Sequence, residues 1–223
     1  MMSKYFITGT GTDIGKTFVT SLLIQHLGQK NKMIGIKPIA AGMEADNALN
    51  NDVTSLLKSS NSLLTAEDIN FYTFKKAVSP HIGAEEENVN VDFEFIKNKI
   101  DVLTNQFDHI LIEGVGGLMS PVDNLRTNLD LIKYLHVPVI FIVGLKLGCI
   151  NEALLTLEVL RSHNIQLLGW IANEVDSKML EINKNIEYLK KNIDCPLIEI
   201  IQHQSKQTKT PGFEAFKKLI HTI

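Results

Sequence analysis

Short, almost wholly apolar runs alternate with helix-length segments along this chain, and that alternation restricts its fold more than any other feature. The apolar runs occupy residues 5–8, 33–36, 108–112, 137–143, 167–172 and 196–201. The helix-length segments begin at Phe18 and follow at about 92–105, 127–135, 150–163 and 178–192. Strands with so little polar alternation are buried on both faces. We therefore expect an α/β fold, a mostly parallel sheet with helices on both faces, forming a single domain over residues 1–223.

Composition excludes several classes of protein. The chain has 223 residues, 44% of them hydrophobic, and a net charge of −3, which gives no electrostatic footprint for nucleic acid. The longest apolar run, Val137 to Ile150, is interrupted by Lys146 and is too short to span a membrane. The first residues lack the apolar region of a secretory signal. Cys149 and Cys195 form no disulfide framework or zinc motif, so a reduced, cytoplasmic protein is expected.

A glycine-rich segment, Gly9-Thr-Gly-Thr-Asp-Ile-Gly-Lys-Thr17, lies between the first predicted strand and the first predicted helix. Glycines allow backbone N–H groups to approach a phosphate, and the helix N-terminus adds positive potential. Lys16 adds a full charge, and the Thr17 hydroxyl is a ligand for Mg²⁺. The strict P-loop pattern is missed because Thr10 stands where it requires glycine. The segment predicts a nucleotide phosphate site on a P-loop NTPase-like fold.

Charged side chains follow two other predicted strands where each strand ends. Ligands of parallel sheets bind at these carboxyl ends. Glu113 sits at the position of a metal-binding acid, and Asp52 is a second candidate carboxylate for Mg²⁺. Lys37 follows the second strand, where it would neutralise charge during phosphoryl transfer. The alternatives are a solvated strand end for Glu113, a helix N-cap for Asp52 and a surface lysine for Lys37.

Other polar residues admit two interpretations each. The Gly114-Val-Gly-Gly117 segment either presents N–H groups to an anion or forms a flexible turn. Asn173, directly after the apolar run 167–172, either contacts adenine or makes a turn. His81 either faces a substrate or makes a structural hydrogen bond. The guanine-reading pattern Asn98-Lys-Ile-Asp101 falls within a predicted helix and is interpreted as coincidence. Residues 42–90 are expected to be surface loops.

Six segments, in order, resemble the dethiobiotin synthetase family from about residue 4 to residue 200. They are the glycine-rich segment 9–17, Lys37-Pro38, Ser79-Pro-His81, Glu113-Gly-Val-Gly-Gly117, Lys146-Leu-Gly-Cys-Ile-Asn151 and Trp170-Ile-Ala-Asn173. The resemblance implies closure of the ureido ring of dethiobiotin from 7,8-diaminononanoate and CO₂, with ATP and Mg²⁺. One amine forms a carbamate, ATP phosphorylates it, and the second amine displaces phosphate. This chemistry needs no protein nucleophile.

The resemblance also implies roles for individual positions. Lys16 and Lys37 would stabilise the transferring phosphoryl group, and Thr17, Asp52 and Glu113 would hold Mg²⁺. The nucleotide would be bound by the two glycine-rich segments and by residues near adenine. In the first segment and just after it these are Thr12, Asp13, Ile14, Gly15 and Phe18. In the second they are Gly114, Val115 and Gly116, and near adenine they are Asn173 and Glu174. The diamine would meet Thr12, Lys37, Gly116 and Gly117. In a homodimer, residues of the neighbouring subunit would complete that site: Leu147, Gly148, Asn151 and Tyr188.

The sequence departs from the family pattern in two places. Ala41 stands where a Ser or Thr hydroxyl usually contacts the substrate, and the lost hydrogen bond would cost about 0.5–1.5 kcal/mol of binding. Glu199-Ile-Ile-Gln202 stands where G-x-[IV]-P usually lies beside adenine. The alternative function is an ATP-driven switch of the partition-protein type. Such proteins commonly carry another lysine early in the loop, and residues 9–15 contain none. A cobyrinate-type amide ligase would need a further glutaminase domain.

Overall fold

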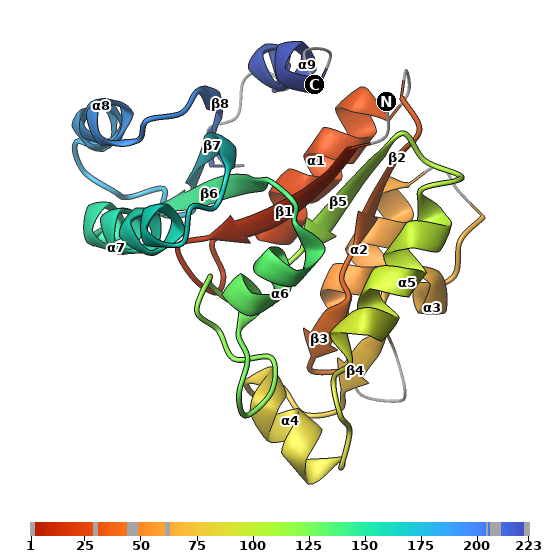
Figure 1. Cartoon of the computed structure of the whole chain (residues 1–223). Coiled ribbons are helices and arrows are strands. Elements are labelled where there is room, and N and C mark those ends of the chain that lie inside the picture. Colours follow the sequence, from red (N-terminus) through yellow and green to blue (C-terminus); the bar gives the residue numbers. More distant parts are fainter. Residues whose placement is uncertain are drawn as a thin grey trace.

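The computed structural model describes residues 3–28, 31–43, 49–60, 63–203, 205 and 211–220. In this part of the chain the main sheet has six strands in the order β2-β5-β1-β6-β7-β8, and every neighbouring pair is parallel (Figure 1). The six predicted apolar runs are these strands: β1 (Ser3–Gly9), β2 (Met33–Ile36), β5 (His109–Glu113), β6 (Val139–Leu145), β7 (Leu167–Glu174) and β8 (Leu197–Ile201). The predicted parallel α/β fold is therefore confirmed.

Helices cover both faces of this sheet. The chain steps from β1 to β2 in one direction across the sheet and from β5 to β8 in the other, and right-handed crossovers then place the connecting helices on opposite faces. One face carries α1 (Lys16–Leu27), α2 (Asn51–Ser59) and α9 (Glu214–Ile220), and the other carries α5 (Phe93–Leu103), α6 (Asn128–Leu135), α7 (Cys149–Ser162) and α8 (Ile182–Asn192) (Figure 1). Among the described helices, none is long and apolar enough to cross a membrane.

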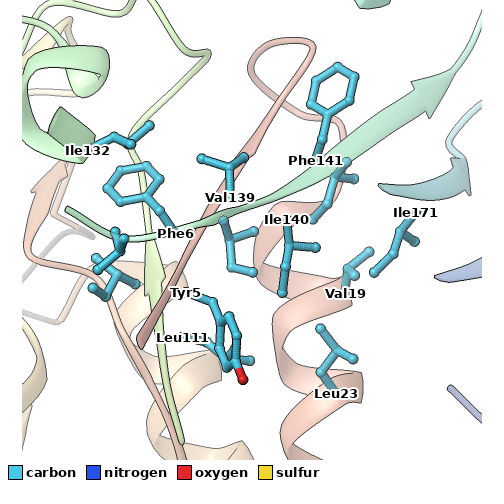
Figure 2. Packing of buried hydrophobic residues seen from close by; sticks show 14 of the residues in the cluster. Tyr5, Phe6, Val19, Leu23, Leu111, Ile132, Val139, Ile140, Phe141 and Ile171 are labelled. Atoms are coloured by element: carbon cyan, nitrogen blue, oxygen red, sulfur yellow. The ribbon is translucent and has the colours of Figure 1, made fainter. Parts of the chain in front are cut away.

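The core lies between the sheet and each helical layer. Successive strand residues point to opposite faces, so Tyr5 and Phe6 are buried on different sides. Figure 2 shows Val19 and Leu23 of α1 on the side of Tyr5, and Ile132 of α6 on the side of Phe6. All five side chains are at most 1% exposed. Two packed layers thus hold β1 rigidly, and the loop that follows β1 starts from a fixed position.

The expectation of surface loops over residues 42–90 is wrong for most of that range. It contains α2, α3 (Ala66–Ile69), β4 (Tyr72–Phe74) and α4 (Pro80–Glu86), while residues 44–48 and 61–62 lie outside the described part. β4 pairs in parallel with β3 (Ile39–Ala41) in a separate two-stranded sheet. These elements are too short to show a clear period in sequence. They extend the molecule beyond the carboxyl ends of β2 and β5.

Candidate active site

A cavity of about 630 Å³ lies at the carboxyl ends of the central strands. Its walls come from the loop after β1, the ends of β2 and β5, the start of α2 and the segment before α4. The lining residues are Thr12, Asp13, Gly15, Lys16, Thr17, Lys37, Ala41, Asp52, Ala77, Val78, Ser79, Pro80, Glu113, Val115, Gly116 and Ser120. Two lysines and three carboxylates therefore share one cavity, as the strand-end rule predicts.

The loop between β1 and α1 is held by neighbouring strands on one side. Thr10 N donates to Ile142 O at 3.1 Å, and the Thr10 hydroxyl accepts from Gly144 N at 3.2 Å, so Thr10 fills the position of the missing glycine with a structural bond. Gly15 has φ +82°, a left-handed conformation that favours glycine. Asn173 Nδ2 donates to Ile14 O at 2.8 Å. β6 and β7 together fix the shape of the loop.

Lys16, the first residue of α1, is only 6% exposed. Its ammonium donates to Gly11 O at 2.6 Å and so folds back over the loop. Burial and then the charge of Lys37 lower the pKa of Lys16 to about 8, against the opposing effect of Glu113, Asp52 and Asp13. A phosphate entering the loop would supply the counter-charge that this lysine lacks.

Lys37 and Glu113 meet across the gap between the ends of β2 and β5. Lys37 Nζ lies 2.7 Å from Glu113 Oε1, 2.9 Å from Asp52 Oδ2 and 3.2 Å from Gly114 O. The Thr17 hydroxyl donates to the same Glu113 oxygen at 2.6 Å. Neither the surface-lysine nor the solvated-strand-end interpretation holds, because Lys37 is 3% and Glu113 1% exposed.

The position of Lys37 is fixed through its backbone. Lys37 N donates to Ile69 O at 2.9 Å, and Asn70 Nδ2 donates to Lys37 O at 2.7 Å. Burial alone would lower the pKa of the Lys37 ammonium, but Glu113 and Asp52 outweigh burial and raise it. Burial alone would raise the pKa of the Asp52 carboxyl, but the Lys37 charge, with bonds from Lys37 and Thr17, lowers it. Both groups are thus held in their charged forms.

Asp52 is not the N-cap of α2. Asn50 occupies that position, where its side-chain oxygen accepts from Asp52 N at 3.0 Å. The Asn50 amide donates to Ala41 O at 3.1 Å and to Gly42 O at 2.7 Å. Asn50 therefore ties the start of α2 to the end of β3, and Asp52 is free of the capping role and faces Lys37.

The residues around Glu113 and Thr17 are chemically suited to Mg²⁺. Hard divalent cations take oxygen ligands, above all carboxylates and hydroxyls. Glu113 Oε2 is buried and has no hydrogen-bond partner among the described residues. A buried, unpartnered carboxylate oxygen is costly unless a cation or water occupies the space before it. With Thr17 and Asp52 on the same cavity wall, the donor set fits the expected metal.

The glycine-rich segment after β5 is not a flexible turn. Asn128, at the start of α6, is 1% exposed and donates to Val115 O at 2.6 Å and Gly117 O at 2.7 Å. Gly117 N donates to the Ser120 hydroxyl at 2.8 Å. Gly116, at φ +64°, faces the cavity with Val115. The segment has a defined shape at the cavity wall.

The structure separates the remaining predicted residues into two groups. Phe18, on α1, and Gly114, after β5, adjoin cavity residues, while Asn173 and Glu174 end β7 behind the loop. The residues expected to act from a neighbouring subunit lie away from this cavity. They are on α7 or just before it, and on α8: Leu147, Gly148, Asn151 and Tyr188.

Sequence reasoning missed the side-chain amides that hold this site. Asn50, Asn70 and Asn128 donate to backbone carbonyls of the segments that carry the charged residues. Only Asn128 had a signal in sequence, because it follows Thr127, whose capping box with Asp130 starts α6. The pattern Asn98–Asp101 lies inside α5, as expected of a chance match.

A parallel sheet with a phosphate loop between β1 and α1, a lysine at the helix start and a carboxylate at the end of an adjacent strand defines a P-loop nucleoside triphosphatase. An AAA domain family (AAA_26) matches residues 3–210. The chain is 40% identical over 203 residues to an ATP-dependent dethiobiotin synthetase BioD of Aromatoleum aromaticum, with 89% of this chain and 90% of that protein covered.

Two further relatives carry the same name. The chain is 39% identical to the protein of Pseudoalteromonas translucida, over 100% of this chain and 98% of that one. It is 42% identical to the protein of Legionella pneumophila (strain Paris), over 88% and 92%. The chain therefore belongs to the ATP-dependent dethiobiotin synthetase family, which confirms the resemblance found in the sequence.

Solved structures at low identity share the fold. A ParA family ATPase from Chlorobium tepidum has a TM-score of 0.53 at 13% identity, covering 99% of this chain and 88% of that one. A cobyrinic acid a,c-diamide synthase from Mycobacterium smegmatis has a TM-score of 0.52 at 13% identity, covering 99% and 93%. These similarities concern the fold alone, and one architecture serves several activities.

Proposed function

We propose that this chain, acting as one domain over residues 1–223, uses ATP to close the ureido ring of dethiobiotin from 7,8-diaminononanoate and CO₂. The observation that carries the proposal is the meeting of Lys37 and Glu113, 2.7 Å apart, in the cavity that Lys16 also lines. Phosphoryl transfer needs charge neutralisation and positioning more than covalent catalysis. Family membership supplies the substrates.

The chain's own residues suit each stage of this reaction. Thr12 and the Gly116 backbone, which line the cavity, and Gly117 next to them would orient the diamine after one amine has formed a carbamate with CO₂. Lys16 and Lys37 would stabilise the negative charge on the phosphoryl group as it passes from ATP to the carbamate oxygen. The second amine then attacks the carbonyl carbon of the mixed anhydride, and phosphate leaves. The interaction of the fixed lysine charges with the phosphoryl group is strong in this cavity, because the cavity limits solvent screening.

Mg²⁺ belongs to this proposal. Thr17, Asp52 and Glu113 would hold it, as the unpartnered Glu113 Oε2 supports. The ion would neutralise phosphate charge. Lys37 contacts one oxygen each of Asp52 and Glu113, which leaves the second oxygen of each carboxylate for the ion. Asp52→Asn removes one of these charged ligands. We therefore expect it to weaken Mg²⁺ binding in the presence of a non-hydrolysable ATP analogue. Calorimetric titration with Mg²⁺ gives this readout without turnover.

Adenine contacts by Asn173 and Glu174 remain part of the proposal. The Asn173 amide nitrogen already donates to Ile14 O, which leaves its carbonyl oxygen to accept from the adenine amino group. Glu174 accepts a bond from His203 N at 3.3 Å, which connects it to the segment after β8. Nucleotide preference would be tested by comparing ATP, GTP and CTP as phosphoryl donors.

A homodimer with a shared substrate site is also proposed. Leu147 is 94% exposed directly before α7, and Tyr188 is 47% exposed on α8. Exposed large apolar side chains of this kind are typical of surfaces that bind a partner. Leu147→Asp should convert the dimer to a monomer and raise the KM for the diamine, as measured by light scattering and steady-state kinetics. A cytoplasmic location is proposed as well, since both cysteines are free thiols.

The decisive experiment measures ATP hydrolysis and dethiobiotin formation with the diamine and bicarbonate each present or omitted. We expect both products only when both substrates are present. Lys37→Gln should lose turnover far more than ATP affinity. ATP hydrolysis that continues at the same rate without the diamine would favour a partition-type switch, whose fold this chain shares.

A further inference from the structure

Ser79, the N-cap residue of α4, does not use its hydroxyl to cap the helix. Ser, Thr, Asp and Asn at this position normally accept a bond from a backbone N–H of the first turn. Here the Ser79 hydroxyl instead lies 3.0 Å from His81 Nδ1. Ser79 lines the reaction cavity, whereas His81 lines a different groove of about 460 Å³. The pair connects two separate spaces through one hydrogen bond.

Several other polar side chains on the described cavity wall already have partners, although Glu113 Oε2 has none among the described residues. Asp52 and Glu113 pair with Lys37, and Glu113 also accepts from the Thr17 hydroxyl. The Ser120 hydroxyl accepts from Gly117 N. Ring closure nevertheless releases a proton each time an amine forms a bond to carbon. The two lysine ammonium groups disfavour a further positive charge in the cavity, so each released proton must be transferred to solvent.

We propose that Ser79 and His81 form a proton relay from the substrate amine to solvent, an inference that rests on the proposed function. As the amine nitrogen bonds to carbon, its N–H bond breaks and the proton passes to Ser79 Oγ. The Ser79 O–H bond breaks in turn, and its proton passes to His81 Nδ1. The imidazolium then loses a proton to water in the groove. No electron transfer or covalent enzyme intermediate is involved, and Ser79 ends as it began.

The charged groups around the pair support transfer in this direction. In the groove that His81 lines, Glu85 lies one turn after His81 on α4. Asp123 and Arg126 line the same groove and form an ion pair with each other at 2.5 Å. Elsewhere around α4, Lys76 pairs with Glu86, Glu87 accepts from Lys75 N, and Tyr72 OH accepts from Asp92 N. The cavity side carries Lys16 and Lys37 with Asp13, Asp52 and Glu113. The groove that His81 lines thus carries two carboxylates, Glu85 and Asp123, and one guanidinium, Arg126, which pairs with Asp123.

His81→Asn tests the relay against a purely structural bond. The Asn amide reaches the position of Nδ1 and keeps a hydrogen bond to Ser79, but it cannot take up a proton. General-base catalysis is worth about 10²-fold or more, so we expect kcat for dethiobiotin formation to fall about 100-fold with both KM values nearly unchanged. Because Asn does not take up a proton, the pH profile of kcat should also lose the limb that a protonated His81 produces. The control is His163→Asn, an exposed residue at the end of α7, which should match the wild type.

Two results would overturn the relay. One is a His81→Asn variant that forms dethiobiotin at the wild-type rate with an unchanged pH profile; the proposed function would then stand and the relay alone would fail. The other needs no turnover. Nitrogen-15 NMR should show His81 Nδ1 as an acceptor at pH 8 and a shift of that signal in Ser79→Ala. If Nδ1 carries the proton at pH 8 and its signal is the same in Ser79→Ala as in the wild type, the relay is contradicted. A wild type that forms no dethiobiotin contradicts the proposed function itself.

Discussion

Lys37 and Glu113 are 76 residues apart in sequence and form an ion pair of 2.7 Å in which both side chains are almost wholly buried. Neither charge has solvent to compensate it, so each depends on the other. The pair also joins the ends of β2 and β5 at the floor of the reaction cavity. The same ion pair therefore contributes to the stability of the fold and to the proposed catalysis.

Lys37→Gln is expected to lower the free energy of unfolding by about 3–5 kcal/mol, because it leaves a buried carboxylate without its counter-charge. The double variant Lys37→Gln, Glu113→Gln should recover much of this loss. Urea denaturation measures both. Lys4→Gln, which removes a half-exposed pair with Asp101, is the control and should cost less than about 1 kcal/mol. Equal losses in the two single variants would contradict the prediction.

ATP affinity should fall above pH 8. Burial holds the pKa of Lys16 at about 8 in the free protein, so Lys16 is charged below that pH and increasingly neutral above it. Bound phosphates favour the charged form, so binding above pH 8 must take up a proton. We expect about a tenfold loss of affinity between pH 7 and pH 9.

Calorimetry at pH 8.5 in two buffers of different ionisation enthalpy should detect this proton uptake. Lys16→Gln should bind the nucleotide more weakly and take up no proton at that site. An affinity that stays level from pH 7 to pH 9 would show that Lys16 remains charged in the free protein.

Asn173→Ala should loosen the phosphate loop. The variant leaves Ile14 O without the donor that now lies 2.8 Å away, at an expected cost of about 1–3 kcal/mol in stability. We also expect ATP affinity to fall by about tenfold, equivalent to about 1.4 kcal/mol. Asn185→Ala removes an exposed amide bond to Glu181 O on α8 and is the matched control. Thermal unfolding and nucleotide titration compare them.

Gly15→Ala should be far more damaging than Gly11→Ala, although both lie in the same loop. A Cβ on Gly15 would sit at φ +82° and 2.3 Å from Asn173 Nδ2, so the left-handed strain of about 1–2 kcal/mol is joined by displacement of the amide. A Cβ on Gly11 meets nothing within 4 Å. The measurement is the free energy of unfolding, and similar values for the two variants would contradict the interpretation of the loop.

The main sheet could be predicted from sequence because its strands are continuous apolar runs such as 139–145, buried on both faces. The small sheet of β3 and β4 could not. Each of its strands has three residues, and their pairing joins segments more than thirty positions apart. In such short elements packing against α4, rather than a local period, decides the structure.

The candidate site divides in the same way. Lys37 and Glu113 could be brought together from sequence, because both follow buried strands and the carboxyl ends of parallel strands meet at one edge. Asn70 and Asn128 could not, since their roles come from carbonyls that only the folded chain brings near them. Ser79 and His81 were visible as a motif, but only the structure shows that they face two different spaces.

β1 precedes the other strands of the main sheet in sequence, yet it lies at the centre of that sheet between β5 and β6 (Figure 1). Its partners begin at His109 and Val139, and the brace from Asn173 is made later still. Contacts of such long range form slowly. During translation the nucleotide pocket therefore stays incomplete until Asn173 has left the ribosome, and ATP can act as a folding ligand only after that point.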